Sequence, residues 1–399
     1  MTLSASKDAP VLIIGAGIAG LTLAQGLRLR SIPFRVFERH PQSHRSQGHR
    51  FRISKDGQED LSRVLSPQMQ ALLRRTAADG HRFEPRYVDA RTLDFTRPTA
   101  VDPETTPAMP VDRSWIRMLL MLDIDDAIEY EKDFSSYEVV DGRVHVRFAD
   151  GSTARGGLLV GADGVRSRVR KQLQPDRRLL DLERWIMWGR TLLTESLKKQ
   201  LPEDVLTWCM YLDREANVQA IVEPMTWAKS VREQSNGRLP DMSDYVYWVI
   251  CTASLQNADL LPRTVEQKRR FLEQLTQTWH PTLKLLLDSA AHDLLACAPV
   301  LSSKPNIELR AADQSGSVTL IGDAAHAMSP MGGSGGDTAV RNAADLAQTL
   351  AREGITIDSI GGFEAKMEER ARERIEHSFN GGKKFWRGGD WTEYTETDT

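Results

Sequence analysis

The chain has 399 residues, of which 40% are hydrophobic and 27% charged, a composition typical of a globular protein with material for two or three domains. Its net charge of −3 gives no electrostatic reason to expect nucleic acid or an anionic membrane as a partner. No signal peptide or membrane-spanning run is evident, so a cytoplasmic protein is expected. Neither a disulfide framework nor a thiolate metal site is expected from the three widely spaced cysteines, Cys209, Cys251 and Cys297.

Near the N-terminus, four apolar residues lead into a glycine-rich turn. Segment 11–14 predicts a buried strand, and Gly15-x-Gly17-x-x-Gly20 predicts a tight turn into a helix. The first glycine permits the bend, the second lets the backbone approach a pyrophosphate, and the third lets the helix pack closely. Glu38 ends a second expected strand about 20 residues further on, where a carboxylate can accept ribose hydroxyls. The alternative is a strand–turn–helix that binds nothing.

Hydrophobic spacing predicts further elements along the chain. Expected helices lie at 21–30, 58–75, 111–122, 165–173, 265–279, 281–287, 338–350 and 363–379, with a β-meander at 137–160 and a buried strand at 158–164. Residues 82–97 look strand-like, and the proline-rich segment 98–110 is expected to be a linker. Asp112 is expected to cap the helix that follows it.

The sequence allows more than one role for each of two further segments. The segment with His49, Arg50 and Arg52 could reach a phosphate or a ring edge, or it could simply be a surface loop. Residues 174–300 hold six of the nine tryptophans, and alternation at 246–250 predicts a sheet with one solvated face. This stretch is expected to be a substrate-facing unit whose tryptophans mostly fill its core.

A second informative stretch spans residues 318–337. A β-branched strand ends in Gly322-Asp323, at the edge where open α/β sheets bind ligands. The glycines that follow would let backbone amides face a flat ligand, and Asp337 is a candidate cap for the next helix. His326 is expected to satisfy backbone groups in a turn rather than act as a base.

Three motifs in this order resemble those of single-component, FAD-dependent aromatic hydroxylases, the class A flavin monooxygenases of the p-hydroxybenzoate hydroxylase fold. They are the glycine turn with Glu38, the run Gly161-Ala162-Asp163-Gly164, and the run Gly322-Asp323-Ala324-Ala325-His326 with Pro330. Fungal secondary-metabolite members look most similar. The resemblance implies an α/β fold with a Rossmann-like FAD-binding domain, an inserted mixed-sheet α+β substrate domain and C-terminal helices.

The resemblance also implies site residues. In it, Arg113 would contact the flavin chain and Asp323 the ribityl hydroxyls, while Asp163 lies in a segment linked to both FAD and the nicotinamide. The residues expected to bind non-covalent FAD are Gly15, Gly17, Ile18, Ala19, Gly20, Glu38, Arg39, Arg52, Arg113, Asp163, Asp323, Pro330, Gly333, Gly335, Gly336 and Asp337. The flavin environment for catalysis would be Pro330, Gly335 and Gly336, with His49 and Arg52 as candidates on the substrate side and no metal.

The last motif departs from the family at three positions. Asp337 stands where the family commonly has Asn, Asn342 where it often has Asp, and Ser334 where Gln is frequent. A carboxylate beside the pyrimidine edge of a reduced, anionic flavin would be unfavourable unless it were protonated or turned away. The departures bear on flavin reactivity rather than on FAD binding.

The resemblance implies an FAD-dependent monooxygenase that consumes NADPH or NADH and O2. It would insert one oxygen atom, by hydroxylation or epoxidation through a flavin C4a-hydroperoxide, into an electron-rich, largely apolar aromatic or polycyclic molecule of secondary metabolism. Alternatives are a flavin oxidase or dehydrogenase on the same scaffold, or a non-catalytic FAD-fold binding protein. The expected division is an FAD-binding domain at 1–80, 100–178 and 300–355, a substrate domain at 81–99 and 179–299, and a C-terminal helix and tail at 356–399.

Overall fold

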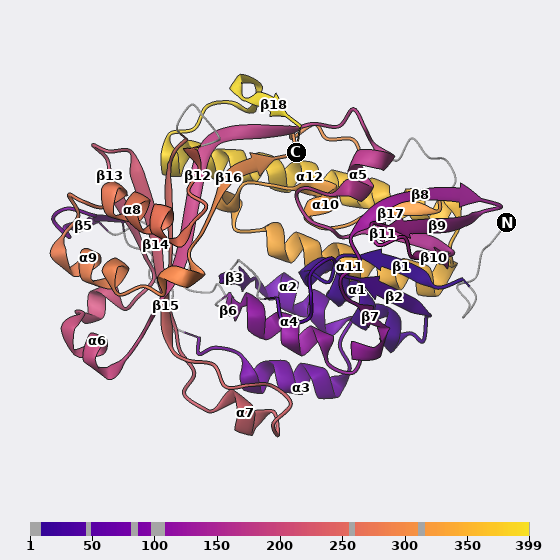
Figure 1. Ribbon diagram of the computed structural model, residues 1–399, viewed down its shortest axis with the longest axis horizontal. Coiled ribbons are helices and arrows are strands. Elements are labelled where there is room, and N and C mark those ends of the chain that lie inside the picture. Colours follow the sequence, from indigo (N-terminus) through magenta and orange to yellow (C-terminus); the bar gives the residue numbers. More distant parts are fainter. Residues whose placement is uncertain are drawn as a thin grey trace.

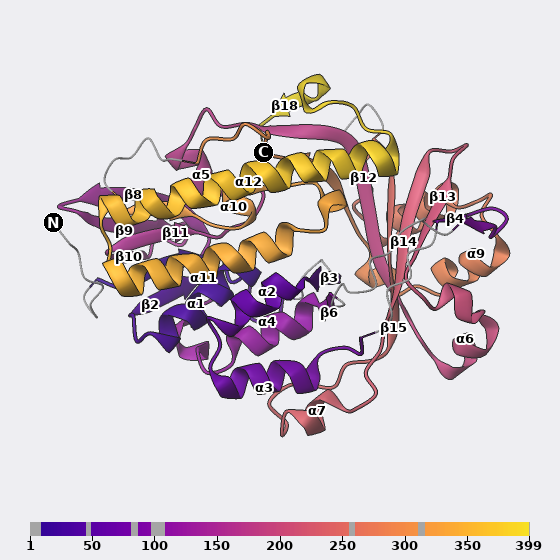
Figure 2. The same cartoon turned by 180° about the vertical axis from the view of Figure 1, so that it is seen from behind.

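A computed structural model of the chain describes residues 9–44, 49–80, 87–96, 108–254, 260–309 and 316–398. Two sheets dominate it, a five-stranded parallel sheet and an eight-stranded sheet. Figures 1 and 2 place them at opposite ends of the molecule, with helices between and around them. Among the described residues, no helix is long and apolar enough to cross a membrane.

The parallel sheet is assembled from segments far apart in the sequence. Its order is β17-β11-β1-β2-β7, with bounds β1 Val11–Ile14, β2 Phe34–Phe37, β7 Ile128–Glu129, β11 Leu158–Gly161 and β17 Val318–Leu320. The three strands β1, β11 and β17 are buried throughout, as expected where helices cover both faces of a parallel sheet. Because all pairs are parallel, the carboxyl ends of these strands share one edge. The predicted α/β fold is confirmed.

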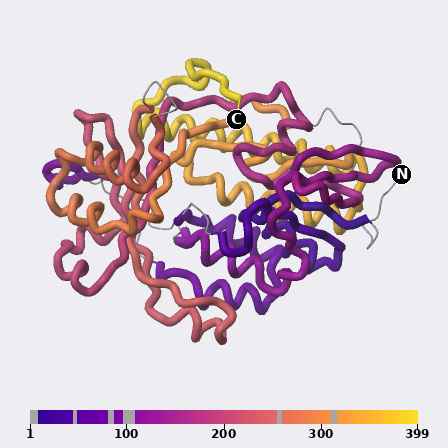
Figure 3. The backbone as a smooth tube through the Cα atoms, viewed as in Figure 1, coloured from indigo at the N-terminus to yellow at the C-terminus, as the bar shows by residue number. Residues whose placement is uncertain are grey.

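Helices from both ends of the chain cover this sheet or pack on the helices that do. They include α1 (Ile18–Leu29), α2 (Lys55–Ser62), α3 (Pro67–Thr76), α4 (Arg113–Met121), α5 (Arg168–Leu173), α10 (Asp323–His326), α11 (Gly335–Glu353) and α12 (Ile357–Trp386). In Figure 3 the orange and yellow C-terminal segment runs beside the indigo N-terminal segment. The approach of α11 to α1 needs a glycine, because a Cβ on Gly26 would lie 2.7 Å from that of Ala347.

The predicted β-meander is confirmed as a small antiparallel sheet. Its strands are β8 (Phe134–Val140), β9 (Arg143–Phe148) and β10 (Thr153–Gly156). Asp141 and Gly142 both have positive φ, at 50° and 71°, which is the backbone that a two-residue turn of this kind requires.

The large sheet has the order β16-β12-β15-β14-β13-β4-β5, with β18 paired to β12. Its strands are β4 Tyr87–Asp89, β5 Phe95–Thr96, β12 Leu179–Leu192, β13 Cys209–Asp213, β14 Val218–Met225, β15 Tyr245–Ala253, β16 Ala296–Ser302 and β18 Thr395–Thr397. The associated helices are α6 (Glu195–Gln200), α7 (Val231–Gln234), α8 (Val265–Leu275) and α9 (Pro281–Asp288).

The prediction that β15 has one solvated face was wrong. Val246, Trp248 and Ile250 pack in one core with α8 and α9, whereas Tyr245, on the opposite face, is also fully buried. The second face is covered because it meets the N-terminus of α4 through a hydrogen bond to Asp112. Trp248 and two other tryptophans of this region, Trp185 and Trp279, are buried, as expected for core residues.

Several predicted boundaries need correction. The helix expected at 58–75 is two helices, because Ser66 caps α3 and Pro67 opens it, and proline cannot sit inside a helix. Residues 109–112, expected in a linker and a helix, form strand β6 (Met109–Asp112), which pairs with β3 (Arg50–Ile53). Helix α5 begins three residues late, after its cap Ser167. The parts of the expected strand and linker at 82–86 and 97–107 lie outside the described residues.

Candidate cofactor site

The glycine turn after β1 has the geometry that its sequence predicts. Gly15 has φ +106°, and a Cβ there would lie 2.5 Å from the carbonyl oxygen of Ala162. A Cβ on Gly20 would lie 2.1 Å from the carbonyl oxygen of Gly15, so this glycine is needed for the turn itself. Gly17, the N-cap of α1, has open space where its Cβ would be. The turn is therefore tight everywhere except at the one position that a ligand would approach.

Glu38 extends from the end of β2 to this turn. Its Oε2 accepts the N–H of Ala16 at 3.0 Å, and its Oε1 accepts the N–H of His40 at 3.0 Å. Each carboxylate oxygen keeps further capacity to accept a ribose hydroxyl. The neighbouring Arg39 is exposed, and its Nε–H donates to the ring of His40 at 3.2 Å.

Arg117 is a residue of this region that sequence reasoning missed. Its Nε–H donates to the carbonyl oxygen of Ala16 at 3.0 Å, which places a guanidinium at the glycine turn. The signal that could have found it is its position four residues after Arg113, because residues i and i+4 share a helix face. Tyr130, which interacts electrostatically with Arg117 and Glu38, has a buried hydroxyl without a hydrogen-bond partner in the described part of the chain.

Asp323 lies at the carboxyl end of β17, at the same edge of the sheet. It is the first residue of α10 and is exposed, and within the described ranges its carboxylate has no hydrogen-bond or ion-pair partner. Gly322 before it has φ +60°, and a Cβ there would lie 2.9 Å from the Cβ of Ala19. The turn thus brings a free carboxylate close to the start of α1.

The glycine loop that follows is divided between packing and open positions. A Cβ on Gly332 would meet Ser378 of α12 at 3.0 Å, and one on Gly336 would meet the Phe51 ring at 2.6 Å. In contrast, Gly333 has open space and Gly335 has only a contact to Met328 at 3.6 Å. Pro330, which opens a short 3-10 helix before the loop, is exposed. The backbone of this loop is accessible at Gly333 and Gly335.

Asp337 points away from the glycine loop. Its two carboxylate oxygens accept the backbone N–H of Ser54, the N-cap of α2, at 3.1 and 3.2 Å. Burial raises the pKa of Asp337, while the contact with Ser54 opposes this. The expected cap of its own helix was wrong, since α11 begins at Gly335 and Asp337 lies in its first turn. The departure at this position therefore stabilises a different helix.

The second departure, Asn342, is the partner of His326. Both side chains are fully buried, and Asn342 Oδ1 contacts His326 Nε2. Burial lowers the pKa of His326, so Nε2 of the neutral ring donates to the amide oxygen. His326 was expected to satisfy backbone groups of the turn, but the partner of its Nε2 is the side chain of Asn342.

Asp163 has both oxygens engaged at the N-terminus of α5. They accept the hydroxyl of Ser167 at 2.5 Å and the N–H groups of Arg168 and Val169 at 2.8 and 3.3 Å. Burial raises the pKa of Asp163, and these hydrogen bonds oppose the rise. Its visible role is to fix the segment after β11.

Arg113 begins α4 directly after the N-cap Asp112, whose predicted capping role is confirmed. The guanidinium of Arg113 lies over the Phe51 ring, with 5.2 Å from Cζ to the ring centroid. Within the described residues it has no hydrogen-bond or ion-pair partner. Because Phe51 also packs against Gly336, an unpaired cation stands beside the glycine loop.

Arg50 and Arg52 extend from β3 to the large sheet, where both pair with the fully buried carboxylate of Glu223 on β14. Arg52 Nη2 lies 2.7 Å from Glu223 Oε1. Burial lowers the pKa of Arg50 to about 10 and that of Arg52 to about 9. Arg52 also lies over the ring of Trp208. No local pattern marks Glu223, which lies 171 residues from Arg52.

His49 has no ring nitrogen free to act as a base. Arg190 Nε–H donates to Nδ1 at 2.9 Å, so Nε2 carries the proton and donates to the carbonyl oxygen of Leu294 at 3.1 Å. Burial, followed by the charge of Arg190, lowers the pKa of His49 to about 4. The suggestion of a substrate-side role for His49 is therefore replaced by a structural role.

This histidine predicts a pH dependence of stability. Between pH 6.5 and about 4 the unfolded chain binds a proton at His49 whereas the folded chain does not, so its contribution to stability is present above pH 6.5 and is lost on acidification. His49→Gln is expected to reduce the fall in unfolding free energy over this range, measured by urea denaturation at a series of pH values. An unchanged slope would contradict the assignment of a neutral, buried His49.

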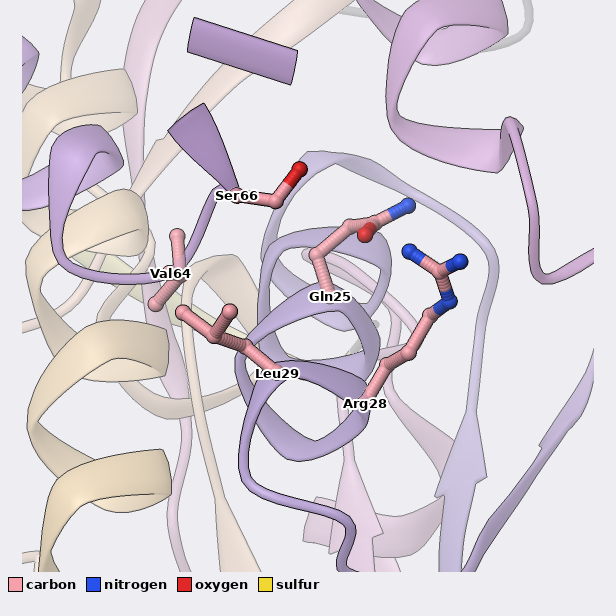
Figure 4. A pocket seen from close by; sticks show the side chains of 5 residues that line it. All are labelled: Gln25, Arg28, Leu29, Val64 and Ser66. Carbon is pink, nitrogen blue, oxygen red and sulfur yellow. The ribbon is translucent and has the colours of Figure 1, made fainter. Parts of the chain in front are cut away.

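A surface hollow lies elsewhere on α1. It is lined by Gln25, Arg28, Leu29, Val64 and Ser66, as Figure 4 shows. These residues come from the second half of α1 and the segment before α3, away from the glycine turn at the start of α1. The hollow is therefore separate from the candidate cofactor site.

Comparison with known families agrees with this geometry. The FAD binding domain family matches residues 117–354, and an NAD(P)-binding Rossmann-like domain matches residues 13–52. The dual O-methyltransferase/FAD-dependent monooxygenase elcB of Phaeosphaeria nodorum is 32% identical over 428 residues, which cover 94% of this chain and 46% of elcB. The chain thus spans about half the length of that relative.

Solved structures share the fold along nearly the whole chain. A candidate FAD-containing monooxygenase from Photorhabdus luminescens subsp. laumondii superposes with a TM-score of 0.79 at 26% identity, covering 95% of this chain and 99% of the other. HpxO of Klebsiella pneumoniae, solved with FAD and uric acid, gives a TM-score of 0.77 at 20% identity over 96% of this chain and 91% of HpxO. The latter similarity shows the fold alone.

Proposed function

The chain belongs to the family of proteins that carry this FAD binding domain, and we propose on that basis that it is an FAD-dependent, NAD(P)H-consuming monooxygenase. It inserts one oxygen atom into an electron-rich, largely apolar aromatic or polycyclic small molecule of secondary metabolism. The observation that carries the proposal is the meeting of three strand ends at one edge: the open Gly17 after β1, Glu38 after β2 and the exposed Asp323 after β17.

These residues fit FAD chemically. The N–H groups at the start of α1 and the guanidinium of Arg113 suit a diphosphate, while Glu38 and Asp323 can accept ribose and ribityl hydroxyls. The accessible backbone at Gly333 and Gly335, at the N-terminus of α11, can donate to the polar edge of the flavin ring. FAD, when bound, supplies the redox chemistry and the activation of O2. The protein orients the reactants and excludes water.

We assign FAD binding to the domain of the parallel sheet and substrate binding to the domain of the large sheet. The FAD-binding domain comprises 1–80, 100–178 and 300–355, the substrate domain 81–99 and 179–299, and the C-terminal helix and tail 356–399. All strands of the parallel sheet fall in the first set of ranges, whereas most strands of the large sheet fall in the second. Substrate would bind on the side of the large sheet that carries Trp208. An aromatic substrate is supported by that tryptophan rather than by the tryptophans buried in the core.

The proposal is tested by isotopic labelling. Product formed under 18O2 with NADPH or NADH should carry one labelled oxygen atom, and the purified protein should be yellow and release intact FAD on heating. Oxidised product without the label, accompanied by hydrogen peroxide, would make the protein an oxidase. Bound FAD that no nicotinamide reduces would make it a non-catalytic binding protein.

We also expect substrate to control NAD(P)H consumption. Flavin reduction should be slow without substrate and at least about tenfold faster with it, a differential of about 1.4 kcal/mol. The open positions Gly333 and Gly335 support this expectation, because they would leave room for the flavin ring of bound FAD to shift along the loop. Anaerobic stopped-flow bleaching of the flavin, with and without substrate, measures the ratio. Equal rates would remove substrate control from the proposal.

A further inference from the structure

The N-terminus of α4 is tied to the large sheet through Asp112. Oδ1 of Asp112 accepts the N–H groups of Ser114 and Trp115 at 2.8 and 2.9 Å, which caps the helix. Oδ2 accepts the hydroxyl of Tyr245, on β15, at 2.7 Å. Arg190, on β12, lies 3.3 Å from the same oxygen. One carboxylate thus joins a helix of the cofactor side to two strands of the large sheet.

His49 links Arg190 back to α4, so that these contacts form a closed network. Arg190 donates to the His49 side chain at 2.9 Å, and the N–H of Arg113 donates to the His49 carbonyl oxygen at 2.8 Å. Arg113 directly follows Asp112 in the chain, so its backbone is held on both sides by contacts that lead to Arg190. Its guanidinium lies over Phe51 and has no hydrogen-bond or ion-pair partner in the part of the chain that the structure describes.

The residues of this network are buried. Asp112 and Tyr245 are fully buried and His49 is 3% exposed. Burial raises the pKa of Tyr245 well above its ordinary value, so its hydroxyl remains a donor. A buried carboxylate separated from its cation is strongly unfavourable, which opposes any shift of β12 or β15 relative to α4.

We propose that Tyr245 and Arg190 are positioning residues for the cofactor. Through Asp112 and His49 they fix the backbone of Arg113, so that its guanidinium stays beside Phe51 and the glycine loop, where FAD would bind. The inference rests on the proposed function, because the role of Arg113 does. It extends the cofactor site to two residues of the large sheet, Tyr245 on β15 and Arg190 on β12.

The test is the dissociation constant of FAD, measured by fluorescence quenching on the apoprotein of the full chain. Tyr245→Phe keeps the ring that lies 4.4 Å from Arg190 Cζ but removes the hydrogen bond, and it should raise the constant at least about fivefold. Arg190→Lys keeps the charge but loses the Nε–H donated to His49, and it should act in the same direction. It serves as the second variant if Tyr245→Phe fails to fold.

A matched control and a double mutant separate positioning from general stability. Tyr211→Phe removes a hydroxyl from the same sheet, in the core beneath α8 and α9, and should leave the constant unchanged. Arg113→Ala should raise the constant, and adding Tyr245→Phe to it should cause no further change.

The outcomes distinguish two failures. If Arg113→Ala leaves FAD affinity unchanged, Arg113 is not in the cofactor site and that part of the proposed function fails. If Arg113→Ala weakens binding but Tyr245→Phe does not, the positioning role is overturned. Equal effects of Tyr245→Phe in both backgrounds would also overturn it, because Tyr245 would then act independently of Arg113.

Discussion

Gly17→Val is expected to abolish FAD binding while leaving the protein folded. A side chain at this position meets no heavy atom within 4 Å of its Cβ in the protein, and the backbone at φ −82° and ψ −175° is one that valine adopts readily. The branched side chain would occupy the space at the N-terminus of α1 that a diphosphate needs. FAD content after purification and the melting temperature of the apoprotein measure the two effects.

Gly20→Ala is the matched comparison, and unlike Gly17→Val it should destabilise the apoprotein as well. Its single methyl group would lie 2.1 Å from the carbonyl oxygen of Gly15, so the turn itself must shift. We expect a lower melting temperature of the apoprotein together with weakened FAD binding. If Gly17→Val retained FAD as the parent does, the placement of the diphosphate at this turn would be wrong.

Glu223→Gln is expected to lower the free energy of unfolding by roughly 3–5 kcal/mol, the cost of leaving buried charges without their partner. Glu223 is fully buried, and the side chains of Arg50 and Arg52 are only 11% and 19% exposed. Without the carboxylate, two guanidiniums would face each other at the junction of β3 and the large sheet. Urea denaturation of the apoprotein measures the change.

The control is Glu215→Gln, which removes a carboxylate that also pairs with an arginine, Arg91, but is 78% exposed. Its effect should stay within about 0.5 kcal/mol, because exposed ion pairs contribute little. Equal effects of the two substitutions would mean that the pairs of Glu223 are screened by water and do not hold the sheets together.

The parallel sheet and the edge at which the cofactor site lies could be predicted from local sequence patterns. Gly15 and Gly322 follow buried apolar strands and Gly20 lies in the first turn of α1, and steric limits leave little choice of residue at these positions. Each of these turns is formed by residues that are close together in the chain, so its geometry can be predicted from that short stretch of sequence. The same applies to Asp112, whose capping bonds reach only two and three residues along the chain.

The partners of the charged residues could not be predicted, because they depend on contacts between distant segments. Asp337 could have faced the flavin edge, yet it accepts the backbone N–H of Ser54, the N-cap of α2, which lies 283 residues earlier in the chain. The hydroxyl of Tyr245 on β15 can be buried because it donates a hydrogen bond to Asp112, which lies 133 residues away in the chain. Glu223 looks like an ordinary strand residue until Arg50 and Arg52 meet it. Such pairings depend on how the sheets and helices pack, and no periodicity in the sequence records a contact between segments that only folding brings together.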